Sequence, residues 1–182
     1  MKRRTLTLYL AAATAAVAVV GGVTLALAQA EPETQGPSAP AGPPTLYASC
    51  QEQLDGAVTA LPPGPGDPPN RKNLLKCSEG SWTTFRAEYP SSDRWLSTGA
   101  EVSLAGQGVR NAEFMSGRWT ATPQAEDTVC RAKYVEVTDP SSKATETHEL
   151  AGDPGGPLSF DVPDWMLRVT LSGYCLWERQ AD

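Results

Sequence analysis

The chain of 182 residues contains one histidine, His148, and no Cys-x-x-Cys pair among its four cysteines. One histidine excludes any metal site or catalytic scheme that needs two, and the missing Cys-x-x-Cys leaves zinc-ribbon and thioredoxin-like sites without support. No Gly-x-Ser-x-Gly motif gives a serine the context of a hydrolase nucleophile. Basic residues are also scarce: 15 Lys and Arg stand against 21 Asp and Glu, which argues against nucleic-acid binding.

Residues 1–30 lack acidic side chains and carry three basic ones at positions 2–4. An apolar stretch runs from Leu6 to Ala28 and ends in Ala28-Gln29-Ala30, a pattern typical of a signal-peptidase cleavage site. A helix over this stretch reaches about 34 Å at 1.5 Å per residue, enough to span the hydrocarbon core of a bilayer. We predict either a cleaved signal peptide or a retained N-terminal membrane anchor. Both place the remaining chain outside the cytoplasm, secreted or anchored.

The segment after the leader is rich in proline. Residues 31–44 read EPETQGPSAPAGPP and contain no large apolar side chain, so they cannot bury enough surface to offset the entropy of ordering. We predict an extended linker here. Residues 1–30 hold three of the 15 basic residues and none of the 21 acidic ones, so the rest of the chain has a formal net charge of −9. Such a charge favours solubility and disfavours anionic lipid and nucleic acid.

All four cysteines lie beyond the leader, at Cys50, Cys77, Cys130 and Cys175. An even number of cysteines in an exported chain predicts two disulfides, which four cysteines can form in three ways. We favour Cys50–Cys77 and Cys130–Cys175, because the first pair brackets a loop rich in Pro and Gly and the second joins two strand-like segments.

Residues 45–79 are expected to form an extension of helix and loop that is tied by the disulfide Cys50–Cys77. Apolar residues between Tyr47 and Leu61 recur at intervals of three or four, which predicts a short N-terminal helix over 45–61. The run PPGPGDPP over 62–69 predicts a loop.

Residues 80–182 change to alternating apolar and polar side chains, separated by turn sequences such as PSSD, AGQG and AGDPGGP. This alternation predicts strands with one buried and one solvated face. The strand-like segments are 81–89, 101–104, 112–122, 128–137, 158–162, 167–171 and 174–179. We therefore expect a mainly β fold, an antiparallel β-sandwich or small barrel with a short N-terminal helix and two disulfides.

Five tryptophans lie in this β region. Trp177 is two residues from Cys175 on the same predicted strand face, which indicates a core position. Trp95 and Trp165 stand in turn-rich sequence and are the better candidates for exposure. An exposed indole can stack on a sugar ring or dock a protein partner, so these two are the candidate binding residues.

No catalytic residue, metal ligand or cofactor is predicted. His148 has Glu146 and Glu149 nearby as possible orienting carboxylates, but no neighbouring nucleophile. The acidic residues match no calcium loop and stand in sequences typical of turns. His148 is therefore interpreted as a histidine on a polar edge or loop.

The final run Gly173-Tyr174-Cys175-Leu176-Trp177-Glu178-Arg179, with the leader and linker, resembles small exported β-rich proteins of high-GC Gram-positive bacteria and of their phages. The resemblance covers Gly80 to Arg179, implies an exported β domain and carries over no catalytic residue. We expect a non-enzymatic extracytoplasmic binding or structural domain with an extracellular or cell-envelope partner, and membrane contact only through the N-terminal segment. The alternatives are a carbohydrate or cell-wall module that uses exposed Trp, and a secreted hydrolase with an acidic site.

Overall fold

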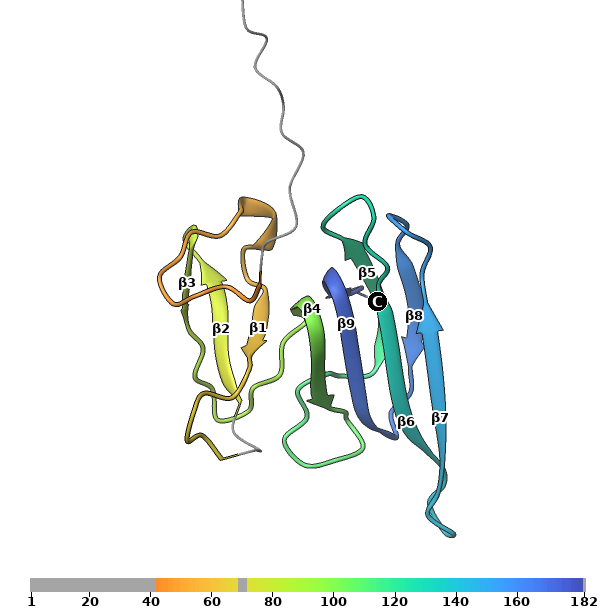
Figure 1. Cartoon of the computed structure of the whole chain (residues 1–182). Helices are drawn as coiled ribbons and strands as arrows, with labels where there is room; N and C mark the ends of the chain where they lie inside the picture. The colour runs from red at the N-terminus through yellow and green to blue at the C-terminus, as the bar shows by residue number, and fades with distance from the viewer. Residues whose placement is uncertain (1–41, 69–71, 182) are drawn as a thin grey trace, which may run out of the picture. The chain divides into compact units, whose positions relative to one another are not determined.

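The computed structural model describes residues 42–68 and 72–181 (Figure 1). The predicted leader, residues 1–30, lies outside the described residues, as does the predicted linker up to residue 41. Within the described ranges, no helix is long and apolar enough to cross a membrane.

The described residues are mainly β, as the sequence predicts. One turn of 3-10 helix, η1, precedes nine strands. Their bounds are η1 Glu52–Leu54, β1 Val58–Leu61, β2 Asn73–Ser78, β3 Ser81–Thr84, β4 Arg94–Ala105, β5 Gly117–Pro123, β6 Arg131–Asp139, β7 Ala144–Ala151, β8 Leu158–Val162 and β9 Met166–Arg179.

All nine strands belong to one open sheet with the order β3-β2-β1-β4-β9-β5-β8, to which β6 is joined through β9, and β7 through β6 (Figure 1). The sheet is mixed rather than purely antiparallel as predicted, because β1 and β4 run parallel and pair through Val58 and Trp95. The hairpin of β2 and β3 intervenes between them, so the chain returns to β4 in the direction of β1.

Strand β9 is where the sheet forks. One of its edges pairs with β4, from Arg168 to Glu178. The other edge pairs with β6 up to Ser172 and then with β5 from Cys175 onward. Gly173 lies between the two partners with φ +90°, and a Cβ there would stand 2.4 Å from the carbonyl oxygen of Val129, so only glycine fits.

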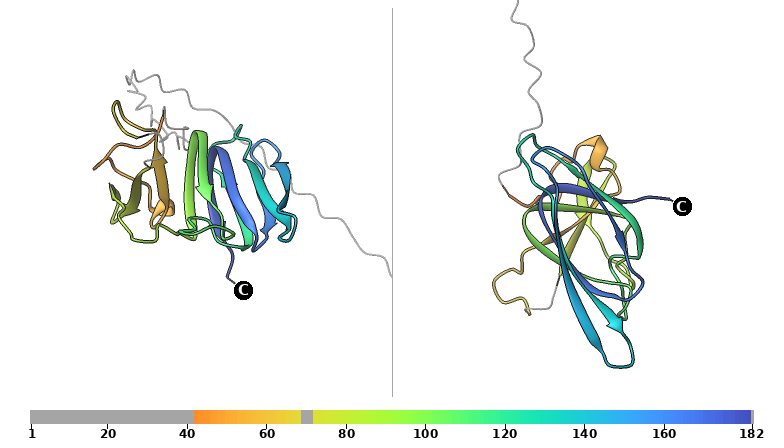
Figure 2. Two further views of the ribbon diagram at one scale, coloured as in Figure 1. Left: turned by 90° about the horizontal axis from the view of Figure 1, so that it is seen from below. Right: turned by 90° about the vertical axis from the view of Figure 1, so that its right-hand side faces the viewer.

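Beyond this fork, β5 pairs with β8 to form one two-stranded ribbon, and β6 pairs with β7 to form another. The two ribbons face each other (Figure 2). Tyr134 of β6 stacks on Phe160 of β8 with the ring centroids 6.2 Å apart, although their strands share no hydrogen bonds in the sheet. The disulfide Cys130–Cys175 joins the start of β6 to β9 at the fork. The two pairings in the structure, Cys50–Cys77 and Cys130–Cys175, are the ones favoured by the sequence.

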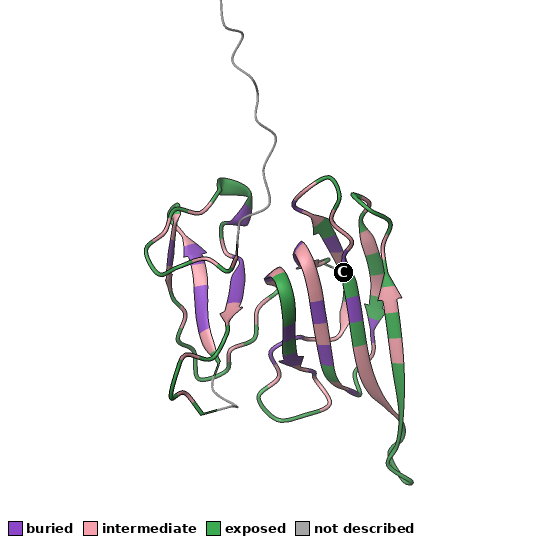
Figure 3. Ribbon diagram, in the orientation of Figure 1, coloured by how far each residue is buried: buried purple, intermediate pink, exposed green. Residues whose placement is uncertain are grey.

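Side chains on the two faces of the sheet form two apolar clusters. Trp95 opposes Trp177 across β4 and β9, and both belong to the larger cluster. The next pair, Leu96 and Leu176, points to the opposite face and belongs to the smaller cluster. Figure 3 shows the resulting bands of buried and less buried residues along β9.

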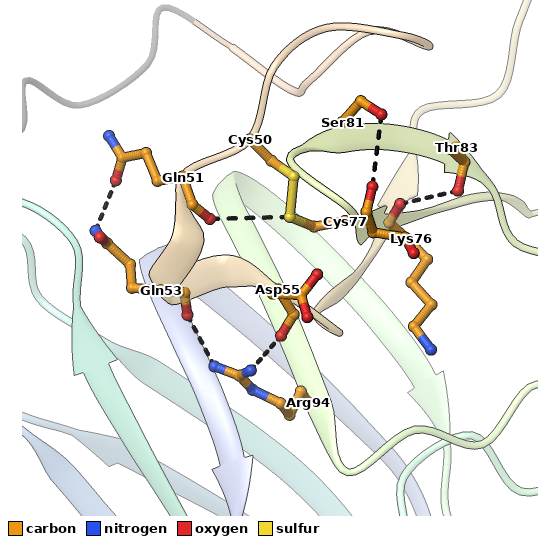
Figure 4. The surroundings of a disulfide bond; sticks show 10 residues. Cys50, Gln51, Gln53, Asp55, Lys76, Cys77, Ser81, Thr83 and Arg94 are labelled. Atoms are coloured by element: carbon orange, nitrogen blue, oxygen red, sulfur yellow. Dashed lines mark hydrogen bonds between the residues drawn. A yellow bond between two sulfur atoms is a disulfide. The ribbon is translucent and has the colours of Figure 1, made fainter.

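The helix predicted over residues 45–61 does not form. Only η1 is helical, and Val58–Leu61 is strand β1. Gly56 adopts φ +80° and donates its N–H to the carbonyl of Cys77, which turns the chain into the sheet. Arg94 at the start of β4 donates to the carbonyls of Gln53 and Asp55 and holds the helical turn in place (Figure 4).

Candidate functional site

Of the two tryptophans that the sequence predicts as binding residues, the structure exposes one and buries the other. Trp165 is 58% exposed, in the turn before β9. Trp95 is only 1% exposed, so the prediction that it is exposed is wrong. The turn sequence before it ends at Asp93, and Trp95 already belongs to β4, where its indole N–H lies 3.0 Å from the carbonyl of Ser92.

A groove of about 960 Å³ lies where β1 and β4 separate. We call it the β1–β4 groove. It is lined by Pro43, Ala60, Leu61, Pro62, Pro63, Lys72, Thr98, Ala100, Glu101, Val102, Ser103, Leu104, Ala105, Val109, Val135, Leu167 and Arg168.

Proline opens this groove. Strand β1 ends at Leu61 because Pro62 and Pro63 have no N–H to continue the hydrogen-bonding ladder. Strand β4 continues to Ala105. Beyond Trp95, β4 has β9 as its only strand partner within residues 42–68 and 72–181. Its second edge therefore offers backbone N–H and C=O groups toward the groove, as edge strands do, except at Ala105, which is bonded to Glu113 and Phe114.

The loop after β4 contributes an exposed apolar side chain to the groove. Val109, which lines it, is 39% exposed in the loop after β4. That loop packs on the start of β9: Gly108 donates its N–H to the carbonyl of Met166 at 2.8 Å. A Cβ at Gly108 would lie 2.9 Å from the carbonyl of Trp165, so the turn that carries this exposed indole abuts the loop.

The charges of the groove are few. Lys72 forms an ion pair with Glu113, whose buried carboxylate also accepts the N–H of Ala105 at 2.7 Å. Arg168 is exposed and forms no ion pair with any described residue. Glu101 is the one carboxylate among the described lining residues, and none of them is a histidine.

His148 lies on β7, half-buried, with its Nε2 2.9 Å from Glu136 Oε1. The sequence suggested Glu146 or Glu149 as its carboxylate partner. Glu149 is instead paired with Lys133 at 2.6 Å, which lowers the pKa of Glu149 and raises that of Lys133. Glu136 was missed because the hairpin register, which only the fold defines, brings it to His148 from β6.

Comparisons with protein-family models, curated proteins and solved structures found no match for this chain.

The sequence pattern did not predict the β1–β4 groove. The Pro62-Pro63 pair is the one visible signal, since it stops a strand. Nothing local to β4 reveals that its neighbour ends early.

Proposed function

We propose that this chain is a non-enzymatic extracytoplasmic binding domain whose ligand is an extended polypeptide segment held in the β1–β4 groove. The observation that carries the proposal is the open edge of β4 beyond Trp95, which runs beside an apolar groove. An extended peptide added to such an edge forms main-chain hydrogen bonds, and its alternate side chains enter the neighbouring pockets.

The lining defines the chemistry of this ligand. Ala60, Leu61, Val109 and Leu167 line the groove without being fully buried and so offer apolar contacts, and its volume of about 960 Å³ suits a few ligand side chains. Arg168, which has no ion-pair partner among the described residues, would favour an acidic group on the peptide.

The compartment is part of the proposal. Two disulfides persist in oxidising environments, which favours a location outside the cytoplasm. The leader pattern of residues 1–30 supports export. For the fold, the contact of Tyr134 with Phe160 between the two ribbons supports the sandwich-like layering that the sequence predicts.

A random peptide display library, selected on the full disulfide-bonded chain, tests the groove. Binders are measured by fluorescence anisotropy against wild type, Ala100→Asp and the matched control Ala87→Asp. Both alanines are exposed, but only Ala100 lines the groove. We expect Ala100→Asp to weaken binding at least about tenfold, because it buries an unpaired carboxylate against the ligand. Ala87→Asp should leave the affinity unchanged.

N-methylated versions of the selected peptides test the mode of binding. Methyl groups on alternate residues remove the donors along one peptide edge, so one of the two alternating patterns should abolish binding and the other should be tolerated. Equal tolerance of both patterns would exclude strand addition. Unchanged affinity of Ala100→Asp would place the peptide elsewhere, and a selection that yields no binder counts against a peptide ligand.

Trp165 favours a second candidate, a carbohydrate or cell-wall module. It is the exposed one among five tryptophans, all of which are described; the other four are at most 3% exposed. A single indole gives one stacking platform instead of a strip, so this function ranks second. Co-sedimentation with purified peptidoglycan tests it, with Trp165→Ala expected to remove binding and Tyr89→Ala, another exposed aromatic, as the control. Sedimentation that Trp165→Ala does not reduce would contradict it.

A secreted hydrolase has the least support. Glycoside hydrolysis needs two carboxylates across the substrate, and Glu101 is the one carboxylate among the described residues that line the β1–β4 groove.

A further inference from the structure

We propose that Glu136, Glu146 and His148 bind a divalent transition-metal ion of the zinc class on the hairpin of β6 and β7. One ligand atom from each of the three side chains lies within 4.8 Å of the other two. His148 Nε2 and Glu136 Oε1 are 2.9 Å apart. Ligands around a tetrahedral zinc ion stand about 3.4 Å apart, so small side-chain rotations place all three around one ion.

The hairpin register builds this cluster. Tyr134 opposes His148 and Glu136 opposes Glu146, so the four residues occupy two rungs of one sheet face. The exposed side chain of Glu146 leaves the cluster open to ions from solvent. Glu146 is exposed, whereas His148 and Glu136 are half-buried.

Aromatic packing fixes the imidazole. The His148 ring stacks on Tyr134 with the centroids 4.7 Å apart, and Tyr134 in turn stacks on Phe160. Phe160 meets Trp177 of the core edge-on. The ring of His148 is therefore held by a ladder that begins in the core, with Nε2 directed at Glu136. Such support for a ligand lowers the cost of ordering it around an ion.

The electrostatics of the hairpin favour a cation at this position. Glu136 and Glu146 stand opposite each other, which costs free energy unless a positive charge lies between them. Lys133, the neighbouring cation on β6, is engaged with Glu149. A divalent ion would neutralise both carboxylates.

The donor set indicates the class of metal. An imidazole suits zinc, copper, iron and nickel, whereas carboxylates also accept harder ions. One imidazole with two carboxylates suits a borderline ion such as Zn²⁺ and leaves coordination positions for water or a partner's side chain. The three residues do not line the β1–β4 groove, so this site is independent of the proposed peptide ligand.

Zinc chloride titrated into the full disulfide-bonded chain, followed by calorimetry, tests the site. We expect one saturable site that His148→Ala weakens at least about tenfold, with similar losses for Glu136→Gln and Glu146→Gln. The matched control is Glu149→Gln, which removes the next carboxylate on β7, outside the cluster, and should leave the zinc affinity unchanged.

Nitrogen-15 spectra of the imidazole provide a second measurement that needs no variant. Coordination through Nε2 should shift the Nε2 resonance of His148 and leave the ring proton on Nδ1, so that the Nδ1 resonance is that of a protonated nitrogen. Absence of saturable binding, or zinc binding that His148→Ala leaves intact, would overturn the proposal. An unshifted Nε2 in the zinc-saturated chain would also overturn it and leave His148 as the ion-pair partner of Glu136 alone.

Discussion

The indole N–H of Trp177 donates a hydrogen bond of 2.9 Å to Ser97 Oγ in the core of the sheet. Both residues are at most 1% exposed. The Ser97 hydroxyl lies 3.4 Å from the carbonyl of Cys175 and donates to it. One hydroxyl thus satisfies a buried indole on β9 and a buried carbonyl next to the disulfide of Cys130 and Cys175.

Ser97→Ala should lower the free energy of unfolding by about 1–3 kcal/mol, because it leaves the buried N–H of Trp177 without an acceptor. Urea unfolding followed by circular dichroism measures the loss. Ser103→Ala, on the exposed part of the same strand, is the control and should change stability by less than about 0.5 kcal/mol. Equal effects of the two variants would mean that the hydrogen bond of Trp177 has little net value.

Gly173→Ala should destabilise the chain more than Gly99→Ala. The two glycines face each other across β4 and β9, and both adopt positive φ. Gly99 has open space around it, so its substitution by Ala should cost about 1–2 kcal/mol for the backbone conformation alone. At Gly173 the new Cβ also meets the Val129 carbonyl at 2.4 Å, and this overlap should lower the free energy of unfolding by about 1–3 kcal/mol more, the usual cost of overpacking.

The measurement is urea unfolding of both variants under the same conditions. Should Gly173→Ala prove too unstable to purify while Gly99→Ala folds, the ranking is the same. Equal losses in the two variants would show that the chain at Val129 relaxes away from the fork without cost.

Removing either disulfide should cost several kcal/mol. The sequence separations are 27 for Cys50–Cys77 and 45 for Cys130–Cys175. The entropy of the unfolded chain then predicts losses of about 3.5 and 4 kcal/mol when each pair is replaced by Ala. Loss of both should bring the chain to the margin of folding, since total stabilities are about 5–15 kcal/mol. Unfolding midpoints that do not move would refute the stabilising role.

Residue alternation predicted the segments that become β6 and β8, because each buries one face more than the other. The sequence predicts two shorter strands in place of β9, with a turn at Gly173, because glycine is a common turn residue. In the structure the same glycine allows close approach of the Val129 carbonyl inside a continuous strand. The fork is thus the feature that local pattern hides.

Strands β1 and β7 escaped prediction for opposite reasons. The apolar residues of Val58–Leu61 lie at intervals that also fit a helix, and a strand of four residues is too short to show alternation. Strand β7, ATETHELA, is largely exposed on both faces and lacks an apolar stripe. The sequence around Trp95 is rich in turn residues and so predicts exposure. Its burial depends instead on pairing with Trp177, which is far away in the sequence. The groove and the cluster at His148 depend on such distant pairings.

The turn between β6 and β7 should respond to acid at an unusually low pH. The carboxylate of Asp139 accepts hydrogen bonds from the hydroxyls of Ser141 at 2.6 Å and Ser142 at 2.7 Å, and from the N–H of Ser141 at 2.9 Å. These bonds, the hydroxyl of Ser141 first, lower the pKa of Asp139 from 3.8 to about 2.

A folded-state pKa below the unfolded one means that the carboxylate's contribution to the turn is complete above pH 3.8 and is lost as the pH falls through about 2. A carbon-13 NMR titration of Asp139 should therefore have its midpoint near 2. In the double variant Ser141→Ala with Ser142→Ala, the midpoint should return toward 3.8. Ser159→Ala, on β8, is the control and should leave the midpoint in place. A wild-type midpoint near 3.8 would mean that the serine hydroxyls do not hold this carboxylate in solution.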